Sequence, residues 1–350
     1  MGHINDFHSE IIGALREREN EVFVMARGAE ADFNIPFEKR LLSLSNLKNL
    51  FRIRKILNAQ RFDAIILNTN LAAFIIRLAL PKRLKKTTKV INFVHGYLFS
   101  SVMGVLRRAF FLFCEMLVRG RCDTVITMNS EDYRAALRYS LARERVIASG
   151  GVGIRPRPLD TPADKIRREL SSDGCTVLAF VGELSRRKNQ AFIIRCLPRI
   201  RERFGNALLW LVGEGSARDD LSHLARKLQV DDAVKFLGYR EDAMDIMRAC
   251  DLYVSASLVE GMPLNVIEAM SIGKTVLASR IKGHIDLISD GINGYLYNPL
   301  DEDEFIDRAY RILSGGMLDP VRVVDSVKEY GRSGAVERIL SIFLEEIPGL

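Results

Sequence analysis

The sequence has few residues that form disulfides or structural metal sites: its 350 residues include five cysteines and one tryptophan. The cysteines lack the spacing of a metal site, and most lie inside apolar runs, so a reduced, cytosolic protein is expected. The polar stretch after Met1 does not resemble a secretory leader. The longest apolar run, residues 109–118, is too short to span a bilayer and contains Glu115.

The sequence also lacks internal repeats and low-complexity tracts. Its composition, 48% apolar and 27% charged, is that of a globular protein, and its length exceeds the usual size of one core. A stretch rich in glycine and proline covers residues 149–158, as expected of a linker. We therefore predict two domains, residues 1–155 and residues 156–350, with the terminal helices packing back towards the first.

Positive charge is concentrated in the first half. Residues 1–157 contain 26 Lys and Arg against 14 Asp and Glu, a net charge of +12, whereas the remainder has 25 against 30, a net charge of −5. The Lys/Arg clusters are not interleaved with stacking aromatics, so nucleic acid is not an expected partner. Arg107 and Arg108 precede an apolar run, which is typical of a helix at an anionic membrane surface. A core-facing helix with a basic outer face is the alternative.

Short apolar runs alternate with helical patterns along the whole chain, which indicates βαβ units and parallel sheets. In the first half we predict strands near residues 21–25, 64–67, 90–94 and 124–127. In the second half we predict strands near residues 176–181, 208–212, 234–236, 252–255, 275–278 and 294–297.

The predicted first domain begins unusually. A Rossmann-like domain opens with an apolar strand that leads into a glycine loop, but here the chain begins at Met1-Gly2-His3, where that loop is already under way. The first strand is therefore predicted to be missing. Either translation starts upstream of the given Met, or the sheet lacks its central strand, and the cost of unpaired backbone groups favours the former.

Glu260 and Glu268 bracket a segment, Glu-Gly-Met-Pro-Leu-Asn-Val-Ile-Glu, that follows an apolar strand and opens a helix. Pro263 suits the first helical position because it has no N–H. The N–H groups around Leu264 and Asn265 are then unpaired at the positive end of the helix dipole, where phosphate binds readily. The carboxylates would be on the order of 10 Å apart, roughly the span from a sugar to the ribose of a nucleotide-sugar. The alternative is a surface helix with two solvated glutamates.

Three further segments follow predicted strands: Val181-Gly-Glu-Leu-Ser-Arg-Arg-Lys-Asn189, Leu211-Val-Gly-Glu-Gly215 and Val234-Lys-Phe-Leu-Gly238. With the Glu260 segment they resemble the donor half of the retaining glycosyltransferases of family 4, and residues 92–97 and 123–129 are similar to that family's first domain. Residues 2–8 and 283–286 are most similar to its bacterial capsule and exopolysaccharide branch. The resemblance covers nearly the whole chain. It implies an α/β, GT-B fold, with two Rossmann-like domains whose parallel sheets face a central cleft.

The resemblance also implies roles for individual residues. The residues that it implies for catalysis are His95, Lys188 and Glu260. Those that it implies for donor binding are Gly182, Arg186, Arg187, Gly261, Met262, Pro263, Leu264, Asn265 and Glu268. On the acceptor side we expect Gly2, His3, Asn5 and His8.

One position departs from the family pattern. The family commonly has an arginine directly after the glycine at Gly182, but this chain has Glu183. Lys188, six positions after that glycine, matches the family's phosphate-binding lysine and would neutralise the departing diphosphate. Arg186 or Arg187 would then supply the second cation, with a solvated turn as the alternative reading of both. As a residue of a surface turn, Lys188 is expected to contribute little to stability.

No metal or other cofactor is expected. Asp301 and Asp303 have the spacing of an Asp-x-Asp metal site, but Glu304 follows Asp301 by three residues, which is a capping-box pattern. The Gly213-Glu-Gly215 segment lacks the third glycine of a dinucleotide fingerprint, so a dehydrogenase is disfavoured. His284 is a further candidate for the donor site, and Asp286 beside it is as easily explained as a helix N-cap.

The sequence therefore predicts a hexosyl- or N-acetylhexosaminyl-transferase that moves a sugar, with retention, from a nucleotide-sugar, preferably UDP-linked, to a lipid-linked or polysaccharide acceptor. Its expected place is the inner face of the cell membrane, in cell-surface polysaccharide synthesis. Two rival functions remain: a nucleotide-sugar epimerase of similar architecture and a non-catalytic sugar-nucleotide-binding assembly protein.

Overall fold

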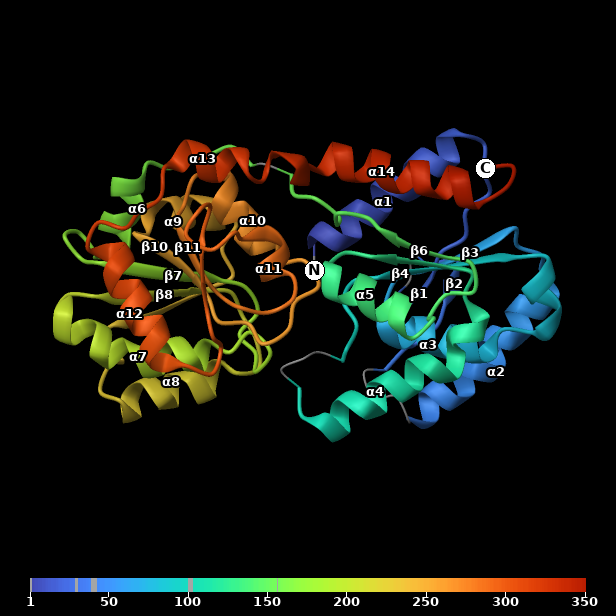
Figure 1. The fold of residues 1–350 in the computed structure, drawn as a ribbon, viewed down its shortest axis with the longest axis horizontal. Helices are drawn as coiled ribbons and strands as arrows, with labels where there is room; N and C mark the ends of the chain where they lie inside the picture. The colour runs from blue at the N-terminus through green and yellow to red at the C-terminus, as the bar shows by residue number, and fades with distance from the viewer. Residues whose placement is uncertain (1, 29–30, 39–42, 100–102, 156) are drawn as a thin grey trace. The chain divides into compact units, whose positions relative to one another are not determined.

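The computed structural model describes residues 2–28, 31–38, 43–99, 103–155 and 157–350, apart from the side chains of residues 2–5 and 85 (Figure 1). The chain divides into two compact units. The first comprises Met1–Gly153 together with Arg332–Leu350, and the second comprises Ile154–Gly331. The division falls two residues before the predicted boundary, and the last helix belongs to the first unit.

The first unit contains a sheet of four parallel strands in the order β3-β4-β5-β6 and a separate parallel pair, β1 and β2. The strands are β1 (Met25–Ala26), β2 (Phe33–Asn34), β3 (Ala64–Leu67), β4 (Lys89–Val94), β5 (Thr124–Thr127) and β6 (Arg145–Ala148). The helices are α1 (Gly2–Glu17), α2 (Leu44–Ala59), α3 (Asn70–Ala79), α4 (Val105–Val118), α5 (Ser130–Arg138) and α14 (Arg332–Glu346), with short 3₁₀ turns η1 (Lys82–Lys86) and η2 (Arg119–Arg121).

The second unit contains a parallel sheet of six strands in the order β12-β11-β10-β7-β8-β9. Its strands are β7 (Val177–Val181), β8 (Leu208–Val212), β9 (Val234–Gly238), β10 (Leu252–Ser255), β11 (Val276–Ser279) and β12 (Tyr295–Tyr297). Its helices are α6 (Ala163–Glu169), α7 (Gln190–Arg203), α8 (Arg218–Lys227), α9 (Ala243–Ala249), α10 (Leu264–Ser271), α11 (His284–Leu287), α12 (Glu302–Leu313) and α13 (Pro320–Asp325), followed by the turn η3 (Lys328–Tyr330).

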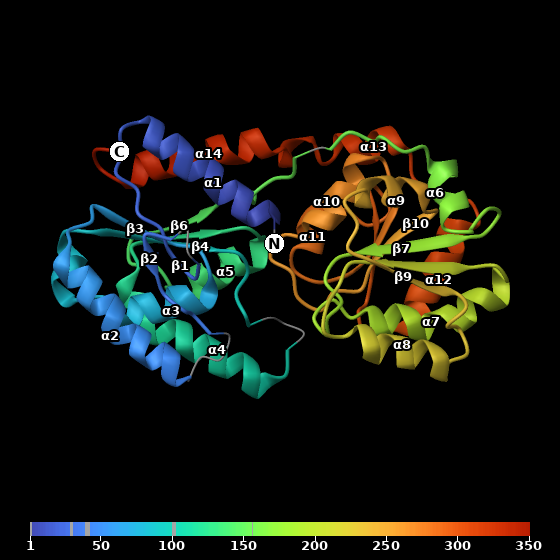
Figure 2. The ribbon, with the colours of Figure 1, turned by 180° about the vertical axis from the view of Figure 1, so that it is seen from behind.

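Helices cover both faces of each sheet (Figure 2). In the second unit, α7, α8 and α12 lie on one face, and α9, α10 and α13 lie on the other. Along β7, Leu178 and Phe180 belong to the core on the first face, while Val177 and Ala179 belong to the core on the second. Burial on both faces explains why this strand reads as a continuous apolar run, as parallel strands do.

Four predicted strands agree with the structure to the residue. The predictions at residues 64–67, 124–127, 208–212 and 252–255 coincide with β3, β5, β8 and β10. The predicted strand at residues 21–25 is wrong in extent, because only Met25 of that segment pairs, and β6 was not predicted. β6 begins with Arg145, and its burial pattern is that of a half-exposed edge, so it gives no continuous apolar signal.

The last helix is fastened to the first sheet by one carboxylate. Glu346 of α14 is buried and accepts a hydrogen bond from the hydroxyl of Thr124 on β5. It also pairs with Lys89 at 2.9 Å and with Arg145 at 2.6 Å, which extend from β4 and β6. Burial raises the pKa of Glu346, but these partners outweigh the burial and leave the pKa below its ordinary value. The charge therefore stabilises the docking of α14 instead of opposing it.

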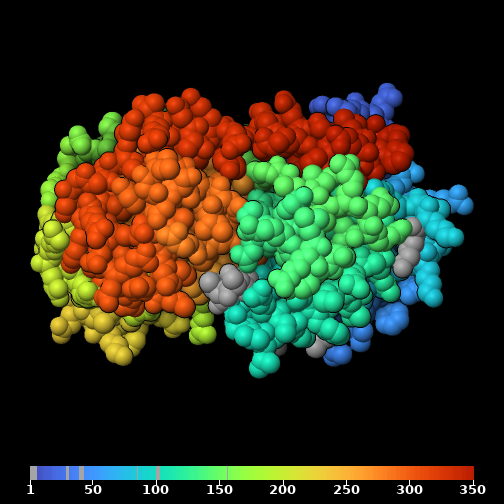
Figure 3. Space-filling model, in the orientation of Figure 1, coloured from blue at the N-terminus to red at the C-terminus, as the bar shows by residue number. Residues whose placement is uncertain are grey.

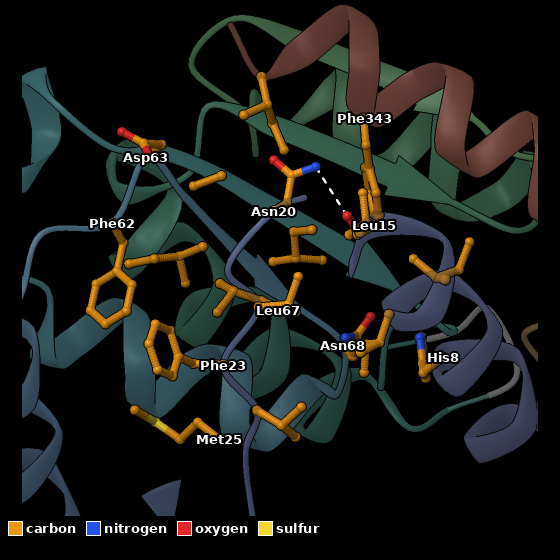
Figure 4. A pocket seen from close by; sticks show the side chains of 18 of the residues that line it. His8, Leu15, Asn20, Phe23, Met25, Phe62, Asp63, Leu67, Asn68 and Phe343 are labelled. Atoms are coloured by element: carbon orange, nitrogen blue, oxygen red, sulfur yellow. Dashed lines mark hydrogen bonds between the residues drawn. The ribbon is translucent and has the colours of Figure 1, made fainter. Parts of the chain in front are cut away.

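An apolar cavity of about 380 Å³ lies in the first unit beside β3 (Figure 4). It is lined by α1, by residues 22–25, by β3 and by α14, with Phe23, Leu67 and Phe343 around it. At one end, Nε2 of His8 and Oδ1 of Asn68 are buried without a hydrogen-bond partner in the described part of the chain.

Unpaired strand edges face this cavity. β3 pairs only with β4 among the described strands, and the bond from Lys89 N–H to Asp63 C=O shows which alternate residues face β4. Backbone groups alternate in direction along a strand, so Ala64 and Ile66 present theirs on the cavity side. Across the cavity, Val24 bonds towards β2, which leaves Phe23 to face the other way.

We predict that a strand-forming extension stabilises the first unit. A short run of valine, isoleucine and threonine fused before Met1 is expected to pair with β3 and fill the cavity, because it supplies both the hydrogen bonds and the apolar side chains that the site lacks. The melting temperature is expected to rise by at least about 2–4 °C, the shift that about 1 kcal/mol produces in a domain of this size. A glycine-serine extension of equal length is the control, and equal melting temperatures for both extensions would contradict the prediction.

Candidate active site

The carboxyl ends of β7 and β10 adjoin at the centre of the second sheet, where the strand order reverses. β7 pairs with β8 on one side and with β10 on the other, and later strands are added outward from both. Ligands of open parallel sheets bind outside the carboxyl ends of the strands at such a reversal. The loops after β7 and β10, together with the helix α10 that follows the second loop, contain the residues that were predicted for donor binding.

Glycines let the loops after β7 and β8 touch through their backbones. Gly182 N–H donates to the Val212 carbonyl at 2.8 Å, and Gly213 follows β8 with a φ of 127°. A Cβ atom at Gly213 would lie 2.2 Å from the Gly182 oxygen, and one at Gly215 would lie 2.2 Å from the Leu184 oxygen. Neither position tolerates a side chain. Gly213 and Gly215 were noted as part of a segment that resembles the family and as an incomplete dinucleotide fingerprint, but this supporting role was not predicted.

One buried glutamine holds the loop after β7 in shape. The side-chain amide of Gln190 donates to the Glu183 carbonyl at 2.7 Å and accepts from Ser185 N–H at 3.3 Å. Asn189, in the left-handed region at φ 56°, then begins α7. Because these hydrogen bonds hold the loop at both ends, they fix the backbone from which Arg187 and Lys188 extend. Gln190 was not predicted, although a polar residue on the apolar face of a predicted helix could have identified it.

Those two cations converge on Glu260, in the loop after β10. Lys188 Nζ lies 2.6 Å from one carboxylate oxygen, and Arg187 lies 3.1 Å from the other. Arg187 also donates to the Val259 carbonyl at 3.2 Å. The structure thus brings together two residues predicted for catalysis, Lys188 and Glu260, and one predicted for donor binding, Arg187.

Lys188 and Glu260 are shielded from solvent, whereas Arg187 contacts the buried carboxylate from an exposed position. Burial raises the pKa of Glu260, but the charges of Lys188 and Arg187 outweigh the burial, so the pKa lies below its ordinary value and the carboxylate stays ionised. Lys188 is buried, so the expectation that it lies on a surface turn is wrong. Its removal would leave a buried carboxylate with a single cation.

The helix α10 begins beside this cluster. Pro263 occupies its N-cap, one residue earlier than the first helical position that we predicted. The Asn265 amide donates to the Val181 carbonyl at 2.7 Å and ties the start of the helix to the end of β7. Within the described chain, the backbone N–H groups of Leu264 and Asn265 make no hydrogen bond. These two donors therefore remain available at the positive end of the helix dipole.

Glu268 lies on the second turn of α10 and is partly buried. Burial raises the pKa of Tyr253 on β10, and the charge of Glu268 raises it further. The Tyr253 hydroxyl donates to the Val181 carbonyl at 3.4 Å. The helix that contains Glu268 starts at the end of β7, because Asn265 bonds to Val181, so Glu268 belongs to the same edge of the sheet as Glu260.

A buried histidine, His284 at the start of α11, lies in the same region after β11. His284 is bracketed by the hydroxyls of Ser255 and Ser279, each 3.2 Å from a different ring nitrogen. Burial lowers the pKa of His284 to about 4, although the charge of Glu260 acts in the opposite direction. The imidazole is therefore neutral at neutral pH. The two serines were not predicted, but both end adjacent parallel strands, which is the signal that could have identified them.

The neighbouring glycine explains how the loop after β10 passes close to α11. Gly283 has a φ of 83°, and a Cβ atom there would lie 3.0 Å from the Gly261 carbonyl. Gly261 and Met262, both predicted for donor binding, are partly buried in this loop. Asp286 is the third residue of α11 and accepts from Gly283 N–H at 3.4 Å, so it is not the N-cap that we predicted.

Two predicted features of the loop after β7 lie at the surface. Arg186 is exposed, and the side chain of Glu183 is also exposed, 3.9 Å from Arg187. The cation that the structure adds to Lys188 is thus Arg187 and not Arg186. Glu183, which replaces the family's usual arginine, does not enter the buried cluster.

In the first unit, two predicted histidines are in contact. The rings of His8, on α1, and His95, after β4, lie 5.3 Å apart in an edge-on arrangement, and His95 also contacts Phe93. Burial lowers the pKa of His95 to about 3 and that of His8 to about 4. Both ring nitrogens of His95 are buried without a hydrogen-bond partner among the described residues. Gly2, His3 and Asn5 lie in α1, but their side chains are outside the description.

The acidic residues considered as a metal site cap a helix instead. The Asp301 carboxylate accepts from Glu304 N–H at 2.9 Å, which confirms the predicted cap of α12. Asp303 pairs with Arg199. Across the part of the chain that the structure describes, no group of three or more His, Cys, Asp or Glu side chains is arranged to hold a metal ion.

Two protein families match the chain, one for each unit. A model described as "Glycosyl transferases group 1" matches residues 163–333, and a model described as "Glycosyl transferase 4-like domain" matches residues 8–150. The first match contains the cluster at Glu260 and the helix α10, and the second contains His8 and His95.

Individual proteins are similar over most of their length. The putative glycosyltransferase EpsD of Bacillus subtilis is 26% identical over 317 residues, which are 87% of this chain and 83% of EpsD. A UDP-Gal:alpha-D-GlcNAc-diphosphoundecaprenol alpha-1,3-galactosyltransferase of Escherichia coli is 26% identical over 82% of this chain and 76% of its own. The crystal structure of HepE from Anabaena with UDP and glucose superposes with a TM-score of 0.70 at 19% identity, over 95% of this chain and 88% of HepE. This superposition shows a shared GT-B fold.

Proposed function

Because the chain belongs to the glycosyltransferases of family 4, and is thus a sugar-transferring enzyme, we propose that it retains the anomeric configuration of the sugar that it moves. The donor is a UDP-sugar, and the acceptor is a hydroxyl of a lipid-linked or growing polysaccharide. The names of two similar proteins support this choice: HepE was crystallised with UDP and glucose, and the Escherichia coli relative is named for a UDP-galactose donor and a diphosphoundecaprenol-linked acceptor.

The observation that carries the proposal is the cationic cluster beside the free start of α10. Lys188 and Arg187 converge at the reversal of the strand order, next to the unbonded N–H groups of Leu264 and Asn265. Together they can neutralise a diphosphate, whose charge grows as the sugar departs. Glu268 is proposed to accept hydrogen bonds from the ribose hydroxyls. Glu260 is proposed to accept them from the hydroxyls of the transferred sugar.

The cluster implies a rearrangement on donor binding. In the free protein, a carboxylate oxygen of Glu260 lies 2.6 Å from Lys188 Nζ. A diphosphate must therefore compete with this carboxylate for the same cation. When Lys188 leaves Glu260, hydroxyls of the sugar would donate hydrogen bonds to the carboxylate in its place. Asn265 and Gln190, whose amides bond to backbone groups of the loop after β7, act as positioning residues. His95 is assigned to the donor sugar on the family resemblance.

Transfer is proposed to proceed on one face of the sugar. The bond from the anomeric carbon to the diphosphate oxygen breaks, and the bond to the acceptor oxygen forms on the same face. The proton of the acceptor hydroxyl passes to the leaving phosphate. No metal is assigned to this step, because Lys188, Arg187 and the dipole of α10 supply the positive charge. The enzyme is proposed to work at the inner face of the cell membrane in cell-surface polysaccharide synthesis.

A transfer assay tests the proposal. Labelled UDP-glucose, UDP-galactose and UDP-N-acetylglucosamine are incubated with the protein, with and without membrane extract, and the product anomer is determined by NMR. We expect acceptor-dependent transfer with retained configuration that a metal chelator does not affect. Lys188→Met should lower turnover by about 100-fold or more, as removal of a transition-state donor does, whereas Lys227→Met on α8 should not. An inverted product, or epimerised donor without acceptor, would contradict the proposal.

The ribose assignment is tested separately by calorimetry with UDP. Glu268→Gln is expected to weaken binding by roughly 1.5–3 kcal/mol, because a neutral amide replaces the charged acceptor of the ribose hydrogen bonds. Glu241→Gln, at an exposed glutamate of the same unit, is the control. Equal affinity of the two variants for UDP would show that Glu268 does not contact the ribose.

A further inference from the structure

The helix α4 exposes one stripe of apolar side chains and buries its one carboxylate. Leu106, Phe110, Phe113 and Leu117 recur at the spacing of one helical stripe, and Leu106 and Phe113 are 89% and 63% exposed. Glu115, in contrast, is buried. The alternative of a core-facing helix with a basic outer face is right in part, because Val118, Phe111 and Leu112 pack against the cores of the first unit, but the outer face of α4 is apolar as well as basic.

The helix α2 shows the same inversion. Leu44, Leu47 and Phe51 lie on its outer stripe, with Leu44 79% and Phe51 71% exposed. The inner stripe of the same helix begins with two asparagines, Asn46 and Asn49. Both helices pack against α3 (Figures 1 and 2). In the space-filling view, α4 forms part of the surface of the first unit (Figure 3).

The inward polar groups are bonded, so the helices cannot simply rotate to hide their apolar stripes. Glu115 pairs with the buried Arg77 of α3 at 2.9 Å. Asn46 bonds to both backbone groups of Glu38, at 3.0 and 3.1 Å, and Asn49 donates to the Pro36 carbonyl at 3.2 Å. Rotation of either helix would leave these polar groups buried and unpaired or would break the ion pair, at a cost of several kcal/mol.

The charges on the outward side of α2 and α4 are all positive. α2 contains no acidic residue, and the only one in α4 is the inward Glu115. The exposed cations are Lys48, Arg52, Arg54 and Lys55 on α2 and Arg107 and Arg108 on α4. We call the outer stripes of α2 and α4, with these cations, the basic apolar face.

We propose that the basic apolar face docks on an anionic lipid bilayer, with its apolar side chains in the interface and its cations at the headgroups. A second copy of the chain is the disfavoured occupant, because two such faces would oppose six cations with six and offer no exposed carboxylate to pair them. Among the described residues, no helix has both the length and the apolar character needed to cross a bilayer. The attachment is thus interfacial. This membrane proposal rests on the proposed function in one respect, which is that the lipid-linked acceptor lies at this surface.

Vesicle sedimentation tests the proposal on the full chain. The protein is mixed with vesicles of phosphatidylcholine alone or of phosphatidylcholine with phosphatidylglycerol, at low and at high salt. We expect binding to the anionic vesicles that weakens at high salt, because exposed charges are screened over about 8 Å at physiological ionic strength. Equal binding to both lipids, or binding to neither, would overturn the proposal.

Matched variants locate the contact. Arg107→Glu with Arg108→Glu should lower the partition coefficient on anionic vesicles at least about 25-fold, since each interfacial cation contributes roughly fivefold. Arg226→Glu with Lys227→Glu changes the charge equally on the exposed side of α8 and should change binding far less.

A second pair of variants tests the apolar side chains. Phe113→Ser with Leu117→Ser should lower binding at least about tenfold, because both side chains would no longer enter the interface. Its control is Leu300→Ser with Val321→Ser, at two exposed apolar positions of the second unit.

Two readouts separate this inference from the proposed function. The affinity for UDP should be the same in Phe113→Ser with Leu117→Ser as in the parent, because neither residue lies in the donor unit. A parent that binds anionic vesicles without binding UDP would sink the proposed function alone. Light scattering supplies the other test: a parent dimer that becomes monomeric in this variant would show that a second copy covers the face and would overturn the membrane proposal.

Discussion

A carboxylate that leaves water must acquire cations or hydrogen-bond donors, and Glu260 meets this constraint with Lys188 and Arg187. The candidate site depends on that pairing. The partners come from loops 72 residues apart in sequence, which the sheet brings together because β7 and β10 are neighbours. The supporting glycines and Gln190 hold the loop after β7 at the required distance. Under the proposed function, the cations that stabilise a buried glutamate in the free protein would also bind the donor diphosphate, so folding and donor binding would use one cluster.

The same constraint also shapes the first unit, where it fixes the orientation of a helix instead of a loop. Arg77 and Glu115 satisfy one another in the interior, and their pairing holds the apolar stripe of α4 outward. An exposed apolar stripe bordered only by cations is costly in water and favourable at an anionic interface. The two units therefore share one rule: a buried ion pair decides which neighbouring groups remain free to bind something else.

Much of the fold could be predicted because strands of a parallel sheet are apolar on both faces. β8 and β10 were predicted to the residue for this reason, whereas β6, an edge strand that begins with Arg145, gave no such signal. The residues predicted for donor binding were named as a set because their segments resemble those of the glycosyltransferases of family 4. Their mutual contacts were not. That Lys188 is buried against Glu260, and that Arg187 and not Arg186 joins them, depends on tertiary packing that local sequence does not encode.

A crystal structure of the protein with a bound UDP-sugar would test most directly whether the cations paired with Glu260 bind the donor diphosphate. We predict that Lys188 Nζ and the N–H groups of Leu264 and Asn265 lie within hydrogen-bond distance of the diphosphate, and that the 2.6 Å pair between Lys188 and Glu260 is broken. A diphosphate bound elsewhere, with that pair intact, would contradict it.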